Sequence, residues 1–238
     1  MRLYRLVLVV CSILGGLLGQ ARAVPELQLD ILGGTYDDSS ETILANSPIF
    51  TLRALLKGAA NLPGPYYISA ALLPAPAQPN SPIDAGSFSV AGVTYSTTSL
   101  SYGVPPLNVP DNMSGNLAKH GVYPTYYKEI SFNFSAAHTI AAYNTESQTG
   151  SSGSLYYYDF TVNVSDLVPG YYLHFDLYDE KIKKGLFSID DFAPFSHDAE
   201  SRPNEGITVP DGGSTAILLG AALMGQWVWR CRRRRMAR

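Results

Sequence analysis

The stretch YYYDFTVNV, residues 156–164, decides the fold class of this 238-residue chain. Apolar side chains occupy every second position of the stretch, and mostly polar side chains lie between them. An alternation with period two is typical of a β-strand that has one face in a core and the other in water. The same alternation recurs in segments 27–31, 129–134 and 172–178. The chain is therefore expected to be built from strands.

Two further segments, 49–56 and 67–73, are almost continuously apolar. Such runs are typical of central strands, and a short helix is the alternative for 49–56. Proline and glycine clusters separate the apolar segments, and no segment has the sustained 3.6-residue periodicity of a helix. The sequence predicts an all-β ectodomain over residues 24–198, an antiparallel, jelly-roll-like β-sandwich of about eight to ten strands.

The N-terminus has the three-part layout of a secretory signal peptide. Two arginines within the first five residues precede an apolar run of 13 residues, 6–18, and Ala21 and Ala23 provide small side chains for a cleavage site. The run is shorter than the ~20 residues that span a bilayer, which argues against an uncleaved anchor. We expect residues 1–23 to engage the Sec machinery and signal peptidase to leave Val24 as the mature N-terminus.

Residues 210–238 have the composition of a membrane segment with a cytoplasmic flank. The segment begins within a short motif made of Val209, Pro210, Asp211, Gly212 and Gly213. An apolar stretch of 16 residues, 214–229, follows and predicts one short transmembrane helix. The arginines behind it form a stop-transfer flank: Arg230, Arg232, Arg233, Arg234 and Arg235. The positive-inside rule then places the body of the chain outside the membrane.

This C-terminal arrangement resembles the PEP-CTERM class of sorting signals, in particular its VPDSG variant. Gly212 stands where that variant has serine. The resemblance implies cleavage near the motif by an exosortase, a membrane-embedded transpeptidase, and transfer of the body to the cell surface or to an extracellular polysaccharide matrix. A membrane anchor that is never cleaved is the alternative. Residues 199–209 are polar, lack aromatic side chains, and read as the linker.

The body of the chain resembles the choice-of-anchor N proteins. These are bacterial surface proteins that share an ectodomain and differ in their C-terminal anchors. The resemblance rests on the segments LQLDI (27–31), GGTYD (33–37), HGVYPTY (120–126), LHFDLY (173–178) and APFSHDA (193–199). It implies display at the surface, and it transfers no biochemical activity.

Charge and cysteine content restrict the function further. Residues 24–209 contain 19 acids and 8 bases, a net charge of −11, which argues against nucleic-acid binding because that needs cations against phosphate. The two cysteines, Cys11 and Cys231, lie in the leader and the tail. The predicted body therefore has no disulfide, catalytic thiol or thiolate metal site.

Catalytic motifs are absent from the body. It contains no Gly-x-Ser-x-Gly elbow and no paired-histidine zinc motif. We therefore expect a protein that is not an enzyme. One candidate site remains on the expected surface, where His174 and Asp176 share a strand face and His197 and Asp198 follow on a later loop. A carbohydrate-active enzyme that uses these groups is the alternative function.

The sequence predicts no cofactor, with calcium as a minority alternative. The acidic pairs 37–38 and 190–191 are adjacent in sequence and fit turns, where carboxylates can be weak Ca²⁺ ligands. Tyrosine doublets at 66–67, 126–127 and 171–172, with the triplet 156–158, place aromatic rings that could contact glycan. We expect an exported protein, first anchored in the inner membrane and then located at the cell surface or in the matrix, with a structural, adhesive or glycan-contacting role.

Overall fold

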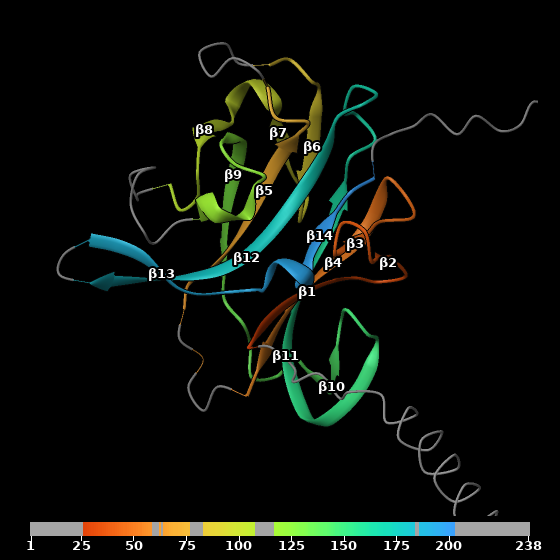
Figure 1. The fold of residues 1–238 in the computed structure, drawn as a ribbon, viewed down its shortest axis with the longest axis vertical. Helices are drawn as coiled ribbons and strands as arrows, with labels where there is room; N and C mark the ends of the chain where they lie inside the picture. The colour runs from red at the N-terminus through yellow and green to blue at the C-terminus, as the bar shows by residue number, and fades with distance from the viewer. Residues whose placement is uncertain are drawn as a thin grey trace, which may run out of the picture.

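The computed structural model describes residues 26–58, 62, 64–76, 83–107, 117–183 and 186–202. These residues form fourteen β-strands and three short 3₁₀ helices, so the all-β prediction is confirmed (Figure 1). The strand number exceeds the expected eight to ten, because six of the strands have only three or four residues. Alternation over so few residues does not stand out in a sequence.

The first sheet has six strands in the order β1-β4-β11-β6-β7, with β10 paired to β11. Every pair in this sheet is antiparallel. Its strands are β1 (Leu27–Ile31), β4 (Ile49–Lys57), β6 (Ser87–Val90), β7 (Val93–Ser96), β10 (Thr139–Asn144) and β11 (Thr149–Asn163).

The second sheet has eight strands in the order β2-β3-β14-β12-β5-β9-β8, with β13 paired to β12. Its strands are β2 (Thr35–Asp37), β3 (Thr42–Leu44), β5 (Tyr66–Leu73), β8 (Ser101–Gly103), β9 (Thr125–Phe132), β12 (Tyr172–Lys183), β13 (Leu186–Phe192) and β14 (Asp198–Glu200). The pairing of β14 with β3 is parallel, and the other pairs are antiparallel. In Figure 1, β13 and the end of β12 form a hairpin arm that projects from the body.

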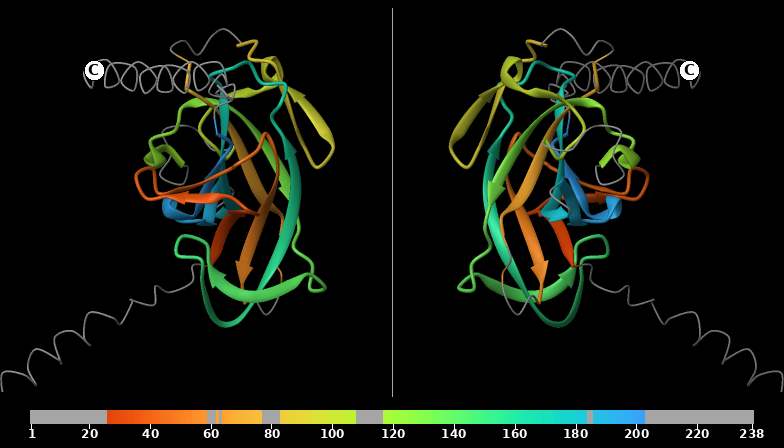
Figure 2. Two further views of the ribbon diagram at one scale, coloured as in Figure 1. Left: turned by 90° about the vertical axis from the view of Figure 1, so that its right-hand side faces the viewer. Right: turned by 90° about the vertical axis from the view of Figure 1, so that its left-hand side faces the viewer.

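The two sheets pack face to face around one large apolar core (Figure 2). Alternate residues of β4 and β11 face alternate residues of β5 and β12 across this core. Aromatic contacts join the two layers, with ring centroids 6.1 Å apart between Phe50 and Phe175 and 5.1 Å apart between Phe132 and Phe160. The segment 156–164 contributes Phe160, Val162 and Val164 to the core, as its alternation predicts.

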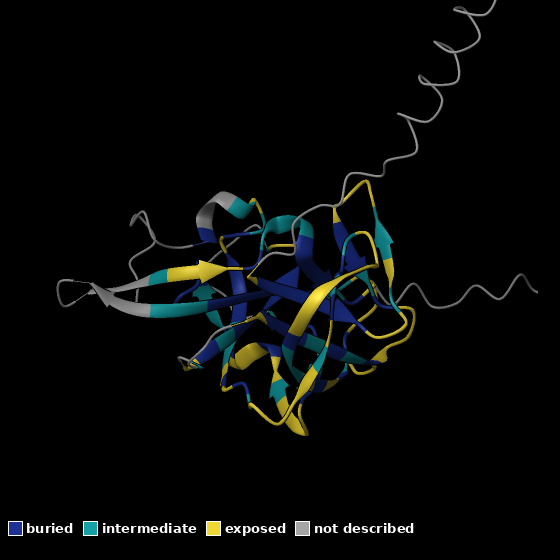
Figure 3. Ribbon diagram, turned by 90° about the horizontal axis from the view of Figure 1, so that it is seen from below, coloured by how far each residue is buried: buried dark blue, intermediate teal, exposed yellow. Residues whose placement is uncertain are grey.

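The eight-stranded sheet is covered on its outer face as well. A second apolar cluster there contains Ala71, Tyr127 and Tyr178 from the sheet and Val104, Leu117 and Tyr123 from the segments that cover it. Residues 117–120 form the 3₁₀ helix η2, which lies over this face. The central strands are consequently buried on both sides, and exposed residues concentrate in the periphery of the sandwich (Figure 3). The polar residues of β12 that we expected to face water are therefore inside the protein.

The same correction applies to β1. Gln28 and Asp30 occupy the polar face of this strand, yet both are buried. The β10–β11 hairpin covers them: the Tyr143 hydroxyl donates to Asp30 Oδ2 at 2.6 Å, and the Thr145 N–H donates to Gln28 Oε1 at 3.0 Å. Buried polar groups are tolerated because they are hydrogen-bonded. β1 does alternate between apolar and polar side chains, but its polar face is covered by the hairpin and is not exposed to solvent.

Several expectations lie outside the described residues: the leader 1–23 with Ala21, Ala23 and Val24, the motif 209–213, and the arginine flank. Among the residues that the structure describes, none belongs to a helix long and apolar enough to cross a membrane. At the C-terminal end of the body, β14 includes residues 199 and 200, and the Ser201 hydroxyl accepts a hydrogen bond from the N–H of Leu173 at 2.8 Å. The ordered body thus continues past residue 198, where we expected the linker to begin.

Candidate functional site

Strands β12 and β14 place four ionisable side chains in one small area on the outer face of the eight-stranded sheet. In their antiparallel register His174 pairs with Glu200 and Phe175 with Ala199. Residues two apart in a strand share a face, so the same register continued by two residues sets Asp176 beside Asp198. Two buried carboxylates side by side repel each other unless positive charge lies between them.

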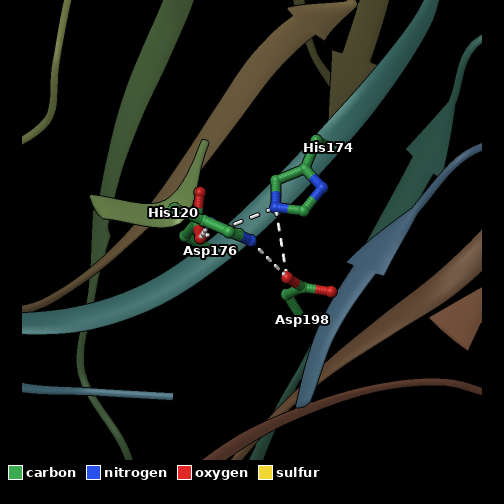
Figure 4. Close-up of side chains that lie close together, drawn as sticks. All are labelled: His120, His174, Asp176 and Asp198. Carbon is green, nitrogen blue, oxygen red and sulfur yellow. Dashed lines mark ion pairs between the residues drawn. The ribbon is translucent and has the colours of Figure 1, made fainter. Parts of the chain in front are cut away.

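His120 supplies one of the groups between them. It comes from η2, more than fifty residues before β12, and its ring lies against both acids (Figure 4). His120 Nδ1 is 2.7 Å from Asp176 Oδ1, and His120 Nε2 is 2.8 Å from Asp198 Oδ2. The imidazole thereby connects the segment that covers the sheet to two neighbouring strands.

His174 lies on the other side of the two acids. Its Nε2 is 3.6 Å from Asp176 Oδ1 and 3.4 Å from Asp198 Oδ2. Its Nδ1 lies 2.8 Å from Glu200 Oε1, the cross-strand neighbour. A carboxylate on one ring nitrogen fixes the orientation of the imidazole and directs the other nitrogen inward.

Asp176 is oriented by a tyrosine. The Tyr123 hydroxyl donates to Asp176 Oδ2 at 2.5 Å and lies 2.8 Å from the hydroxyl oxygen of Ser69. This leaves the second carboxylate oxygen, Oδ1, facing the two histidines. Tyr123 belongs to the segments that cover the outer face of the eight-stranded sheet, which we call the cover. The hydrogen bonds from Ser69 through Tyr123 to Asp176 therefore join β5, the cover and β12.

The facing atoms of the cluster do not form aligned hydrogen bonds with one another. Within the described chain, His120 Nδ1, His174 Nε2 and both carboxylate oxygens of Asp198 are buried without a hydrogen-bond partner. The side chains of His174 and Asp198 are each only 2% exposed. Native structures rarely leave such groups unpaired, and each case requires an explanation such as an ion.

The surroundings shift the pKa values of His120, His174, Asp176 and Asp198. Burial opposes protonation of His120 and His174, but the neighbouring carboxylates outweigh it and raise the pKa of His120 to about 9 and of His174 to about 10. Burial would raise the pKa of Asp176, yet His174 and His120 hold it well below its usual value. For Asp198 burial prevails, and its pKa is raised.

A pocket of about 380 Å³ opens beside the cluster. Its lining includes His120, His174 and Glu200 of the cluster together with Glu41 and Phe195. Phe195 comes from the short helix η3 (Phe195–His197) and stacks on the His120 ring, with centroids 4.2 Å apart and planes 8° apart. The two histidine rings therefore lie between the pocket and the deeper carboxylates.

The structure brings together three of the four residues that the sequence placed in one site. His174, Asp176 and Asp198 converge, but they are buried and do not form a surface site. His197 is also buried and lies beside them in sequence, yet its Nδ1 pairs with the Ser196 hydroxyl at 2.9 Å, and it is not one of the four converging residues. His120, Tyr123 and Glu200 were missed. The segment HGVYPTY contained two of them, but nothing in it indicates which strand it covers.

The acidic pairs show no convergence of their own. Among the described residues, the one group of three or more possible metal ligands is His120, His174, Asp176 and Asp198, and neither acidic pair belongs to it. Asp37 instead accepts hydrogen bonds from the backbone and hydroxyl of Ser39 at the end of β2. The Asp191 N–H donates to Asp179 on the hairpin arm.

The tyrosine doublets and the triplet are buried or half-buried. Tyr126 and Tyr127 are both buried, because both faces of β9 are covered here. Residues 156–158 are half-buried. On the six-stranded sheet, Tyr157 lies beneath the guanidinium of Arg53, 4.6 Å from the ring centroid.

Comparison of the chain with protein-family models, with curated proteins and with solved structures found no significant match in any of the three. The two family resemblances stay predictions, and the site is interpreted from its own geometry.

Proposed function

We propose that the chain is an exported bacterial cell-surface or extracellular-matrix protein, and that its β-sandwich has a structural or adhesive role. The observation that carries the proposal is the extent of the folded body. Its strands begin at Leu27, directly after the expected mature N-terminus Val24, and end at Glu200, before the sorting motif at Val209. All the described strands of the sandwich therefore lie between the expected signal peptide and the expected sorting signal.

The composition of that body supports the same proposal. The sandwich contains no cysteine, so its stability does not depend on the redox state of the compartment. A double-sided core of aliphatic and aromatic side chains holds it together. Such a domain folds after export without disulfide chemistry, which suits a protein displayed outside the cytoplasm.

The proposal extends to the ends of the chain. Residues 1–23 are a signal peptide, and residues 210–238 are a sorting signal with a single transmembrane helix. An exosortase-like transpeptidase cleaves near Asp211 and hands over the body, whose partner is extracellular polysaccharide. The sandwich is jelly-roll-like in this proposal, with one unconventional feature, the parallel contact of β14 with β3.

The alternative is an extracellular carbohydrate-active enzyme. The pocket beside His120 and His174 is the observation that favours it, since Glu41 and Glu200 also line it. Paired carboxylates across a cleft are what glycoside hydrolysis needs. If alanine at both His174 and Asp176 leaves every assayable phenotype intact in a folded protein, this alternative is excluded.

Mass spectrometry of the mature protein tests the proposal directly. The full chain is expressed in a bacterium that has an exosortase, and the surface, membrane and cytosolic fractions are analysed for both ends of the chain. We expect surface material that begins at Val24 and ends close to Asp211. A matched variant with Pro210→Ala and Asp211→Ala should accumulate uncleaved in the membrane.

Two other results have distinct meanings. Intact Arg238 in the mature surface-exposed protein would leave a plain membrane anchor and remove the sorting step. An unprocessed chain that is soluble in the cytosol would overturn the export proposal altogether.

A further inference from the structure

Four buried side chains converge on one point with their ligand atoms facing one another. The atoms come from His120, His174, Asp176 and Asp198, and they all lie within 4.8 Å of one another. In Figure 4 the side chains reach this point from three separate segments: η2, β12 and β14. These atoms form ion pairs, but several of them are buried without an aligned hydrogen bond, unlike the members of an ordinary buried polar network.

We infer that His120, His174, Asp176 and Asp198 bind one divalent transition-metal ion, with Zn²⁺ as the best fit. This inference does not depend on the proposed export or sorting of the chain. It concerns residues of the folded body alone.

The spacing fits tetrahedral coordination. With metal–ligand bonds of ~2.0–2.2 Å, two ligands of a tetrahedral zinc ion lie about 3.4 Å apart. His174 Nε2 is 3.4 Å from Asp198 Oδ2 and 3.6 Å from Asp176 Oδ1, so its separation from each of the two carboxylate oxygens is close to that value. His120 contacts each acid with a different ring nitrogen, at 2.7 and 2.8 Å, and its ring has to turn so that one nitrogen completes the set.

The charges also fit. Asp176 and Asp198 place two negative charges side by side in a buried area, and a divalent cation neutralises both from a single point. Without an ion, the two imidazoles must carry this charge, although their ring centroids are only 4.6 Å apart. A buried cluster of two like-charged rings and two like-charged carboxylates is costly unless every contact is well aligned.

The residues around the four ligands act as a supporting layer. Glu200 Oε1 holds Nδ1 of His174, which is the carboxylate–histidine arrangement that orients imidazole ligands of metals. The Tyr123 hydroxyl holds Asp176 Oδ2 and leaves Oδ1 for the ion. Phe195 stacks on the face of the His120 ring. Two of the four ligands, His174 and Asp176, thus have a hydrogen-bond partner that fixes their orientation.

The ligand types select the metal. Two imidazoles with two carboxylates suit Zn²⁺ and neighbouring transition metals. Ca²⁺ takes six to eight oxygen ligands, which this cluster does not offer. Four protein ligands fill a tetrahedral shell, and closed shells of this kind are typical of structural metal sites.

The position of the ligands indicates what the ion does. Strand β14 has only three residues, and two register pairs connect it to β12. Among the residues that the structure describes, it is also the last strand before the C-terminal segment of the chain. An ion bound to Asp198 of β14, to β12 and to η2 would fasten this strand to the body and close the cover over the sheet. The metal would therefore strengthen the point at which the body continues into its tail.

The test measures metal binding by the full chain, purified in detergent without a histidine tag and stripped with a chelator. One equivalent of Zn²⁺ is added, unbound ion is removed, and bound zinc is measured by elemental mass spectrometry. We expect one zinc per chain and a higher melting temperature, because binding to the folded state alone stabilises it. Co²⁺ in place of Zn²⁺ should give the intense visible absorption of tetrahedral coordination.

Variants identify the ligands. His174→Gln and Asp198→Asn should weaken zinc binding at least tenfold, whereas His138→Gln should bind as the unaltered chain does, because His138 stacks on Tyr157 on the other sheet. Circular dichroism shows whether each variant is folded. If a variant does not fold, the cobalt spectrum of the unaltered chain still tests whether the site binds a metal ion in tetrahedral coordination. The inference would be overturned, in favour of a metal-free ion-pair cluster, if the unaltered chain failed to retain zinc. It would also be overturned if His174→Gln and Asp198→Asn bound zinc as tightly as the unaltered chain.

Discussion

His120 Nε2 lies 2.8 Å from Asp198 Oδ2, and this contact joins the cover of the eight-stranded sheet to the last strand of the body. The two residues are far apart in the sequence and come from short elements, η2 and β14, that have little regular structure of their own. Short segments gain order mainly from the tertiary contacts they make. The His-Asp cluster is therefore the place where two short segments, η2 and β14, are joined to the long central strand β12.

The Tyr123 hydroxyl should be important for stability. Tyr123→Phe removes the hydrogen bond to Asp176 and leaves a buried carboxylate oxygen without its donor. A hydrogen bond to a charged group contributes ~1.5–3 kcal/mol, so we expect a loss of about that size in the free energy of unfolding. Urea denaturation measures it.

The control for this variant is Tyr95→Phe. Tyr95 packs against Phe88 with ring centroids 5.5 Å apart, and phenylalanine keeps this contact. We expect a change of no more than ~0.5 kcal/mol, the usual range for substitutions that spare buried interactions. Equal effects of the two substitutions would mean that the Tyr123 hydroxyl does not hold Asp176 in solution.

Gln28 should be essential for the fit of the β10–β11 hairpin onto β1. Its amide accepts from the N–H of Thr145 and donates to the carbonyl oxygen of Tyr143 at 3.2 Å. Gln28→Met keeps the length of the side chain and leaves both backbone groups unpaired, which costs ~1–3 kcal/mol for each such group. Thermal unfolding should show a clear loss of stability, and hydrogen exchange at Thr145 should accelerate. A methionine variant as stable as the original would show that water replaces these bonds.

The stability of the protein should depend on pH through Glu180. Burial and the nearby charge of Glu129 raise the pKa of Glu180 to about 7, against an opposing contact with Tyr67. The pKa of Glu180 is higher in the folded state than in the unfolded state. The contribution of Glu180 to the stability of the fold is therefore fully present below pH 4.5 and is lost as the pH rises through 7. Glu180→Gln removes this loss. The melting temperature of the variant relative to the original chain should therefore rise between pH 4.5 and pH 8, and a constant difference across that range would contradict the assignment.

The ion pair between Arg53 and Asp159 should contribute little. Its two bonds, Nε to Oδ1 and a terminal guanidinium nitrogen to Oδ2, are both 2.7 Å long, but the Asp159 side chain is 34% exposed. Exposed pairs usually contribute ~0.2–1 kcal/mol. A double-mutant cycle with Arg53→Met and Asp159→Asn should give a coupling energy within that range, decreasing with added salt. A coupling well above it would indicate that the pair is shielded from water.

The sequence was most informative where a strand has one core face. The alternation of residues 156–164 and of 173–177 predicted which side chains enter the main core, and Phe160, Val162 and Phe175 are there. It did not predict that polar faces would also be buried. Gln28 of β1 and His174 of β12 were expected to face solvent. The alternation shows which side chains are polar, but it does not show which strand faces a distant segment will cover.

The candidate site, too, could be predicted from the sequence only in its local part. Residues two apart in one strand must share a face, so the pair His174–Asp176 could be recognised locally, whereas residues 198–200 were expected in a loop and the linker. Their meeting depends on the β12–β14 register, and the arrival of His120 depends on how a loop folds over the sheet. His197 was the natural choice from its position beside Asp198, but its ring turns toward Ser196. Contacts between distant segments are set by the whole fold.

X-ray diffraction at the zinc absorption edge, on crystals of the metal-loaded chain, is the most direct test of the metal centre. We expect one anomalous peak about 2.0–2.2 Å from a ring nitrogen of His120, from His174 Nε2 and from an oxygen each of Asp176 and Asp198. An empty position, with the His120 ring still in contact with both acids, would contradict the metal centre and leave the cluster as a set of buried ion pairs.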